Sequence, residues 1–271
     1  MRIRIKFTRS GPVKFLGHLD LMRYFQKAIR RAEIDIKYTE GFSPHQIMSF
    51  AAPLGVGVES EGEYFDIEVN SSPPRNEAID RLNRAMAEGI SIVDYAEIPD
   101  TAKKAMTVVA AAEYDISLKG ETGKYGFKEE SKADNGDEGS DDIRKADILF
   151  KDKKQLQEIV EELIIKPRSI PIIKKTKKSE KEIDLKSLIY EISVRDSDDK
   201  GNICVNMLLS AGSSENIKPQ LVMEYICGQK GILFDPGNYR ILRKDVYMLK
   251  NSSKPGKKRA DFVPLNSLSL V

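Results

Sequence analysis

Cysteine is scarce in this chain of 271 residues, which has only Cys204 and Cys227. Two cysteines are too few for the disulfide framework of a secreted domain. Both stand among apolar neighbours, in the segments ICVNMLL and MEYICG, so the sequence predicts two buried free thiols. The N-terminus also lacks the apolar core of a signal peptide. These features indicate an intracellular, cytoplasmic protein.

Long apolar runs are also missing. No stretch approaches the ~20 apolar residues that a membrane-spanning helix needs. The chain is 40% hydrophobic and 32% charged, which is typical of a globular protein in water. At 271 residues it can form one large domain or two ordinary ones, each with a core of its own.

Motifs of self-contained catalysis are absent as well. The sequence has no CxxxCxxC cluster motif, no P-loop, no GxSxG and no HExxH. Histidine occurs only at His18 and His45, and two histidines without a third ligand make a poor metal site. The segment Gly55-Val56-Gly57 lacks the third glycine and the following helix of a phosphate-binding loop. We therefore expect no cofactor and no metal, although an enzyme can use scattered residues that no motif reveals.

The formal net charge of +2 conceals a local asymmetry. Residues 1–44 hold ten basic and four acidic residues, whereas residues 129–142 hold seven acidic and one basic. Residues 166–178 contain six basic residues and no acidic one. A basic surface of this kind favours a polyanionic partner. Residues 120–146 are acidic and poor in apolar groups, so we predict a flexible insertion there. Whether it masks the basic surface is left open.

The first hundred residues predict the order strand, helix, strand, strand, helix, strand. Strands are expected at 2–8, 46–54, 64–69 and 90–98, and helices at 18–32 and 73–89. This order is typical of the ferredoxin-like βαββαβ fold, an antiparallel sheet with its helices on one face.

The rest of the chain predicts a looser second copy of that order. Strands are expected at 106–119, 188–195, 202–210 and 239–249, helices at 154–166 and 218–227, and a basic tail at 254–259. The predicted fold class is therefore α+β, with two tandem ferredoxin-like modules at residues 1–100 and 101–271. No residue-level repeat is visible, so the duplication rests on element order alone.

An acidic row accompanies the third predicted strand. Its members are Glu59, Glu61, Glu63, Asp66 and Glu68. Because acidic side chains alternate with other residues there, we interpret the row as the solvent side of a strand.

The first predicted helix carries the strongest functional signal. Its apolar residues gather on one side of a helical wheel, and Arg23, Lys27, Arg30 and Arg31 fall almost opposite. The apolar stripe is expected to pack on the sheet, which leaves a row of cations that can contact phosphates. A solvated charged face without a function fits the same pattern. A second basic run comprises Lys174, Lys175, Lys177 and Lys178.

His18 and Asp20 begin this helix. Asp20 stands three residues before Arg23, the spacing of a helical ion pair. His18 falls towards the apolar side, as a structural histidine does. His45 is expected on a loop at the other end of the helix, so the two histidines need not meet. A role for either one as general acid or base is an open alternative.

Several segments together resemble one family. They are Phe15-Leu16-Gly17-His18-Leu19-Asp20-Leu21, Arg30-Arg31-Ala32, Gly41-Phe42-Ser43-Pro44 and residues 52–60 (APLGVGVES). The chain resembles the radical SAM-linked protein family, whose function is unknown and whose members are encoded beside radical SAM proteins or fused to their C-terminal end. The resemblance is sharp over residues 2–70 and diffuse beyond them.

The resemblance implies a radical SAM protein on a separate chain as partner, acting on RNA or on the translation machinery. The absence of cluster-binding cysteines fits that arrangement. It also singles out a candidate shared surface: His18, Asp20, Gly41, Phe42, Ser43 and Pro44, with His45 beside them.

The sequence thus predicts a non-catalytic, RNA-binding accessory of a radical SAM enzyme. One alternative is a protein-interaction module whose basic helix docks the enzyme without nucleic acid. Another is a metal-independent endoribonuclease, since tandem ferredoxin-like modules also occur in CRISPR repeat-processing endoribonucleases. The sequence specifies neither the target nor the oligomeric state.

Overall fold

The computed structural model describes residues 1–119, 152–175, 180–196, 202–212, 215–250 and 258–270. The predicted acidic insertion at 120–146 lies outside these residues, as do Lys177, Lys178 and most of the predicted basic tail. The chain divides into two compact units. Unit 1 comprises Met1–Glu113, Ser210–Glu215 and Leu242–Val271, and unit 2 comprises Tyr114–Leu209 and Asn216–Ile241. The units are therefore discontinuous in sequence, whereas the predicted modules meet at a single boundary near residue 100.

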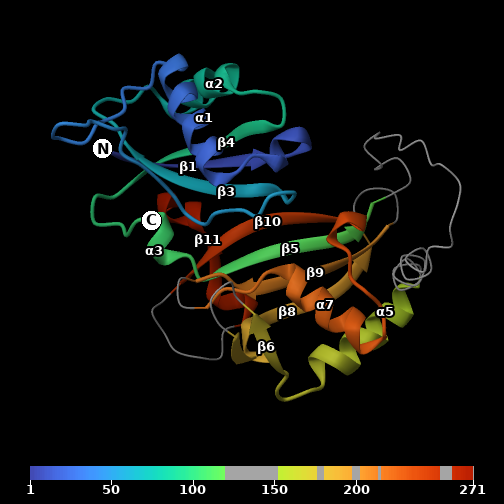
Figure 1. Cartoon of the computed structure of the whole chain (residues 1–271). Helices are drawn as coiled ribbons and strands as arrows, with labels where there is room; N and C mark the ends of the chain where they lie inside the picture. The colour runs from blue at the N-terminus through green and yellow to red at the C-terminus, as the bar shows by residue number, and fades with distance from the viewer. Residues whose placement is uncertain (120–151, 176–179, 197–201, 213–214, 251–257, 271) are drawn as a thin grey trace, which may run out of the picture. The chain divides into compact units, whose positions relative to one another are not determined.

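The fold is mixed α+β, with a large, mostly antiparallel sheet and several helices (Figure 1). This confirms the predicted α+β class. The finer prediction of two tandem ferredoxin-like modules stays a prediction.

Unit 1 opens with the predicted alternation of strands and helices. Its first elements are β1 (Arg2–Arg9), the 3-10 helix η1 (Gly11–Phe15), α1 (His18–Arg31), β2 (Met48–Phe50), β3 (Glu59–Glu68), α2 (Arg75–Ala85), β4 (Ile90–Ile98) and α3 (Ala105–Val108). β1 lies between β4 and β3 and is antiparallel to both. β2 pairs with β3 in antiparallel fashion. The predicted strand at 46–54 is thus a short edge strand that ends before Pro53.

The C-terminal part of the chain adds to unit 1. From Leu242 onward β10 (Tyr239–Leu249) belongs to it, followed by η5 (Arg259–Asp261), β11 (Phe262–Pro264) and η6 (Leu265–Leu270). Leu242 and Arg243 pair in parallel with the start of β3. The polar face of β3 is therefore covered by chain that lies about 180 residues away in sequence.

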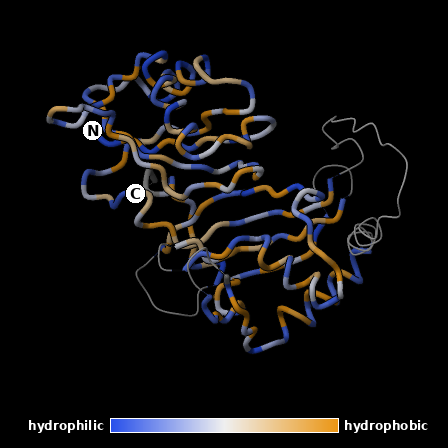
Figure 2. The backbone as a smooth tube through the Cα atoms, viewed as in Figure 1, coloured by the Kyte–Doolittle hydropathy of each residue, from blue (hydrophilic) through white to orange (hydrophobic). Residues whose placement is uncertain are grey.

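The core of unit 1 lies between the sheet and two helices. Alternate residues of β1, namely Ile3, Ile5 and Phe7, are buried against the apolar stripe of α1, as the sequence predicted. α1 and α2 cover the same face of β1, β3 and β4 (Figure 1). In Figure 2 hydrophobic and hydrophilic residues alternate along these elements, which is the pattern from which they were predicted.

The start of α2 differs from the prediction. The helix begins at Arg75 with Pro74 as its N-cap residue, and no side chain caps it. Asn70 and Ser71, which precede the helix, both donate to the carboxylate of Asp35. These hydrogen bonds lower the pKa of Asp35.

Unit 2 contains a hairpin that the sequence predicted. Its elements are β5 (Ala111–Leu118), which begins in unit 1, α5 (Lys153–Val160), η3 (Glu161–Ile165), β6 (Pro171–Lys175), β7 (Glu180–Asp184), α6 (Leu185–Leu188), β8 (Ile189–Asp196), β9 (Ile203–Ser210), α7 (Pro219–Gln229) and η4 (Pro236–Asn238). β8 and β9 pair in antiparallel fashion, as expected. The hairpin of β6 and β7 was not predicted.

Both cysteines are buried free thiols, which confirms the prediction. Burial raises the pKa of Cys204 and that of Cys227 to about 11. The thiolate is the nucleophilic form, so neither thiol is expected to react with Ellman's reagent in the native protein near pH 8. In denaturant both should react at once, and the absorbance of the released thionitrobenzoate measures this. Rapid reaction of the native protein would contradict the burial of these thiols.

Candidate nucleic-acid interface

The four predicted cations of α1 all face solvent. Arg23, Lys27, Arg30 and Arg31 are exposed, while the apolar stripe of the same helix is buried. Arg23 pairs with Asp20 at 3.7 Å, the i,i+3 ion pair predicted from the spacing. Within the described part of the chain, the side chains of Lys27 and Arg30 have no ion-pair or hydrogen-bond partner. The charges on this side of α1 are therefore available to an external anion.

The second helix extends this charged surface. A cleft of about 310 Å³ lies between the C-terminal ends of α1 and α2, and three arginines line it: Arg31, Arg81 and Arg84. Arg31 donates to the carbonyl oxygen of Ala85 at 2.8 Å and thereby ties the two helices together. We call Arg23, Lys27, Arg30, Arg31, Arg81 and Arg84 the basic face.

The arginines of α2 were not predicted from the sequence as part of a binding surface. Arg81 forms an i,i+4 ion pair with Glu77. The local net charge of α2 therefore does not reveal Arg81 as a candidate cation. Arg84 stands in the last turn of α2, where a cation is favourable for the helix dipole by itself. Only the packing of α2 beside α1 joins these two residues to the predicted row.

The residues that carried the family resemblance separate into two places. His18 is half-buried, and its ring meets Phe50 edge to face at a centroid distance of 5.4 Å. The predicted structural role of His18 fits this contact. Gly41, Phe42, Ser43, Pro44 and His45 instead lie exposed on the loop after α1.

Metal-ligating side chains do not gather in the described residues. No group of three or more His, Cys, Asp or Glu side chains there is arranged to hold a metal ion. His45 has a local partner, because its Nδ1 lies 3.1 Å from Oγ1 of Thr39.

The second predicted basic run belongs to unit 2. Lys174 lies in β6, and its Nζ donates to the carbonyl oxygen of Asn216 at 2.6 Å. The backbone of Lys175 pairs opposite Glu180. Lys177 and Lys178 lie outside the described residues. A role for this run in binding stays a prediction.

Within the acidic row, Glu61 is exposed as predicted and Glu68 is half-buried, but the interpretation as a solvent-facing side was wrong for the other three acids. Glu59, Glu63 and Asp66 are buried, and each carboxylate has a basic partner. Arg4 binds both oxygens of Asp66, at 2.8 and 3.1 Å. Glu59 pairs instead with Lys14 of η1, and Glu63 pairs with Arg243 of β10, so these acids are buried where η1 and β10 return to β3.

A buried tyrosine lies in the same region. Tyr64 donates to Oδ1 of Asp245 at 2.7 Å, and Lys6 pairs with Oδ2 of that carboxylate at 2.7 Å. Burial, and then the charge of Asp245, raise the pKa of Tyr64. The phenol is thus held neutral as a hydrogen-bond donor, which makes this group a structural tie between β3, β1 and β10.

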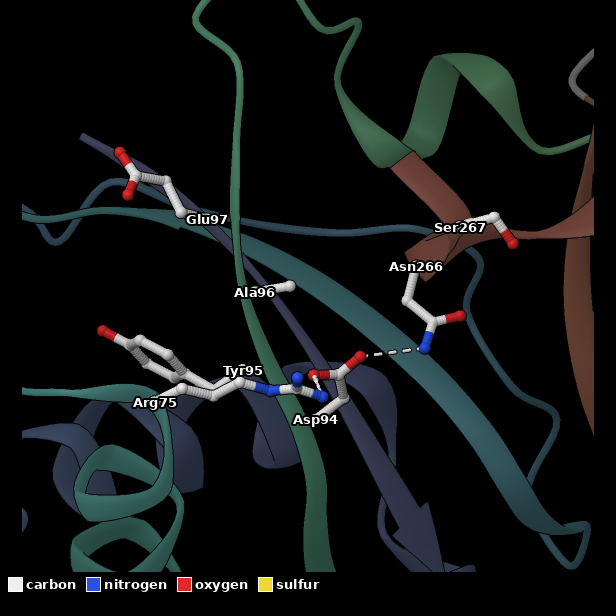
Figure 3. A pocket seen from close by; sticks show the side chains of 7 residues that line it. All are labelled: Arg75, Asp94, Tyr95, Ala96, Glu97, Asn266 and Ser267. Carbon is white, nitrogen blue, oxygen red and sulfur yellow. Dashed lines mark hydrogen bonds and ion pairs between the residues drawn. The ribbon is translucent and has the colours of Figure 1, made fainter. Parts of the chain in front are cut away.

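A second cleft of unit 1, of about 480 Å³, lies along β4 (Figure 3). Asp94 projects into it, and Arg75 pairs with Oδ1 of Asp94 at 2.7 Å. Asn266 donates to Oδ2 at 2.8 Å. Because both oxygens are engaged, we interpret Asp94 as the residue that fixes η6 and the start of α2 to the edge of the sheet.

The fold and the basic face define an α+β protein with a candidate polyanion-binding surface. The chain belongs to the DUF2344 family of uncharacterised proteins conserved in bacteria, whose profile matches residues 2–219. That description does not mention radical SAM proteins, so the predicted association with them stays a prediction. No curated protein matches this sequence.

Two solved structures show weak similarity. One is the crystal structure of a Cbf5-Nop10-Gar1 complex, with 10% identity, a TM-score of 0.41 and coverage of 90% of this chain. The chain spans about half of the matched chain, 48% of its length. The other is an encapsulated DyP-type peroxidase from Mycobacterium smegmatis, with 11% identity, a TM-score of 0.20 and 90% coverage of both chains. Neither TM-score reaches the level at which a shared fold follows.

Among the residues that the structure describes, no helix is long and apolar enough to cross a bilayer.

Proposed function

We propose that this protein binds RNA through the basic face and serves a modification enzyme as a non-catalytic accessory. The observation that carries the proposal is the exposed row on α1, where Lys27 and Arg30 have no partner among the described residues. Each cation that contacts a phosphate releases a condensed counterion, so such a row favours a nucleic acid over a single small anion.

The position of the cations on a packed helix strengthens this proposal. α1 is held by its buried side, where Leu21, Phe25 and Ile29 lie in the core of unit 1. The cations therefore stand on a rigid element with a constant spacing. A rigid array loses less conformational entropy on binding than the same charges on a loose segment would lose.

The proposed enzyme partner is a radical SAM protein on a separate chain. The support for it is the resemblance at residues 15–21 and 41–44 to proteins that are encoded beside such enzymes. The partner would supply the chemistry, and this chain would supply contact with the RNA.

Reversing three charges of α1 tests RNA binding. In the triple variant Arg23→Glu, Lys27→Glu and Arg30→Glu, the affinity for a fluorescein-labelled RNA strand is expected to fall at least tenfold. If each cation contacts one phosphate, the slope of log K against log [salt] should fall by about 2, since a contact on a single strand contributes about 0.7. Fluorescence anisotropy over a salt series measures both quantities.

The matched control changes the same number of charges elsewhere. Lys103, Lys104 and Lys154 are exposed and lie outside the basic face, the first two just before α3 and the third in α5. Their replacement by glutamate changes the net charge equally and should leave the salt slope nearly unchanged. Equal losses in both variants would show that binding follows net charge alone, and the proposed interface would be wrong.

A second candidate function is the docking of a protein partner without nucleic acid. Three large apolar residues are exposed near the start of α1, namely Phe15, Leu19 and Val56. Val56 comes close to Phe15 because the amide of Gly57 donates to the carbonyl oxygen of Lys14 at 2.9 Å. This function predicts that Leu19→Glu abolishes a complex that ribonuclease leaves intact, as size-exclusion chromatography of the purified pair would show.

We also infer that unit 1 is a ferredoxin-like module. The strand order β4-β1-β3-β2, with antiparallel neighbours and with α1 and α2 on one face, supports this inference. In unit 2 the order β5-β9-β8 supports the same inference for a second module. An experimental structure of each unit would test both.

A further inference from the structure

The loop that follows α1 presents an aromatic ring to water. Phe42 is fully exposed, and no other large hydrophobic residue of the described chain has a greater exposed fraction. A single exposed apolar residue needs no explanation in general. The support of this loop and its neighbourhood, however, distinguish Phe42 from a chance exposure.

The loop is held by a closed stem. The amide of Thr39 donates to the carbonyl oxygen of His45 at 2.9 Å, and the amide of His45 donates to Oγ1 of Thr39 at 3.1 Å. Gly41 has a φ of 110°, a conformation that glycine adopts without strain. The tip is thus preorganised, which lowers the entropy that a ligand of Phe42 must overcome.

The stem is also fastened to α1. Gln46 is buried, and its side-chain amide donates to the carbonyl oxygen of Gln26 at 3.2 Å. Gln26 stands three residues after Arg23 and four before Arg30, so all three lie on the same side of the helix. Phe42 stands four positions before Gln46, so their Cα atoms are at most ~14 Å apart. Phe42 therefore stands on a loop whose stem is attached to α1 on the side that carries Arg23 and Arg30.

We propose that the basic face and Phe42 together bind single-stranded nucleic acid. The cations contact successive phosphates, and the ring of Phe42 stacks on an unpaired base. This inference rests on the proposed function and deepens it by naming the ligand class. Aromatic side chains set beside a cationic track are the usual platform for single strands, since every base offers a π face. The bases of a duplex are already stacked on each other. The ring of Phe42 therefore finds no exposed base face on which to stack.

The test compares four full-length proteins on three labelled probes. The proteins are the wild type, Phe42→Ala, Phe42→Leu and Phe42→Trp. The probes are an RNA strand of about 12 nucleotides, a length within the range of single-strand sites, its duplex, and a strand with the same phosphates but without bases. Anisotropy titrations at one salt concentration measure the affinities.

Phe42→Ala is expected to weaken binding of the single strand about tenfold, within the range measured for one stacked base. Binding of the duplex and of the base-free strand should not change, because no phosphate contact is lost. Phe42→Leu should behave like the alanine variant, since it keeps an apolar side chain but lacks the ring. Phe42→Trp should restore binding.

Three outcomes would overturn the inference. If Phe42→Ala binds the single strand as the wild type does, while the triple variant of α1 has lost affinity, stacking is wrong and RNA binding stands. The same conclusion follows if Phe42→Ala lowers the affinity for all three probes equally. It also follows if this variant keeps its affinity for every probe and loses only the binding of a protein partner. If the wild type binds no probe, the proposed function itself fails.

Discussion

Replacement of Asp66 by alanine is expected to lower the free energy of unfolding by about 3–5 kcal/mol, the usual cost of removing one partner of a buried ion pair. The guanidinium of Arg4 is fully buried and binds both oxygens of Asp66. The same carboxylate accepts the amide of Ala105 at 2.8 Å. Without it, a buried cation keeps only the carbonyl oxygens of Leu265 and Lys103 as partners.

Urea denaturation of the wild type and the variant measures this loss as a shift of the midpoint. A double variant, Arg4→Met with Asp66→Leu, should recover most of the stability, because it leaves no unpaired charge in the interior. The control is Asp20→Ala, which breaks an exposed ion pair at 3.7 Å and should cost below about 0.5 kcal/mol. A loss of the same size in Asp66→Ala would contradict the burial of its ion pair.

Replacement of Phe25 by alanine is the second large effect, with an expected loss of about 3–5 kcal/mol. Phe25 is fully buried, and its ring lies 4.8 Å from the rings of Phe7 and Phe65 and 5.8 Å from that of Phe50, between centroids. Truncation removes these contacts and leaves a cavity that α1 cannot close, because its neighbouring side chains pack in the same core.

Phe42→Ala provides a matched control with the same chemical change. Its ring is fully exposed, so its removal should leave the free energy of unfolding nearly unchanged. Thermal unfolding followed by circular dichroism compares the two variants directly. Equal losses at positions 25 and 42 would show that the aromatic core is not where the structure places it. An unchanged Phe42→Ala also makes that variant suitable for the binding test.

Much of the secondary structure followed from local pattern. α1 begins at His18 as predicted, and β4 at Ile90–Ile98 and β10 at Tyr239–Leu249 have the predicted bounds. These elements show a clear period of two or 3.6 residues, and they end at breakers that the chain itself supplies. The predicted start of α2 at residue 73 was two residues early, and Ser72, which precedes it, hydrogen-bonds with Tyr95 and the carbonyl oxygen of Pro73 instead of capping the helix.

The acidic row shows where local pattern fails. A strand that alternates acids with apolar residues looks the same whether water or a row of cations lies opposite. Glu63 meets Arg243, which is 180 residues away, and Asp66 meets Arg4, which is 62 residues away. Whether this face of the strand is exposed to solvent or buried thus depends on which distant segment packs over it. The local sequence pattern does not contain that information.

For a related reason, the part of the basic face on α1 could be predicted from the sequence, but the part on α2 could not. The cations of α1 lie opposite its apolar stripe, and one helix is enough to show this. Arg84 joined the surface only because α2 packs beside α1. The attachment of the Phe42 loop to α1 likewise involves a contact between distant residues, the hydrogen bond from Gln46 to Gln26.

The sequence by itself determined the α+β class, the buried thiols and the cationic side of α1, because periodicity and neighbouring residues act over a few positions. The tertiary structure alone decided that Glu59, Glu63 and Asp66 are buried and that the stem of the Phe42 loop is attached to α1. Those outcomes depend on contacts between residues far apart in the chain, and their free energies exist only once the segments have folded together.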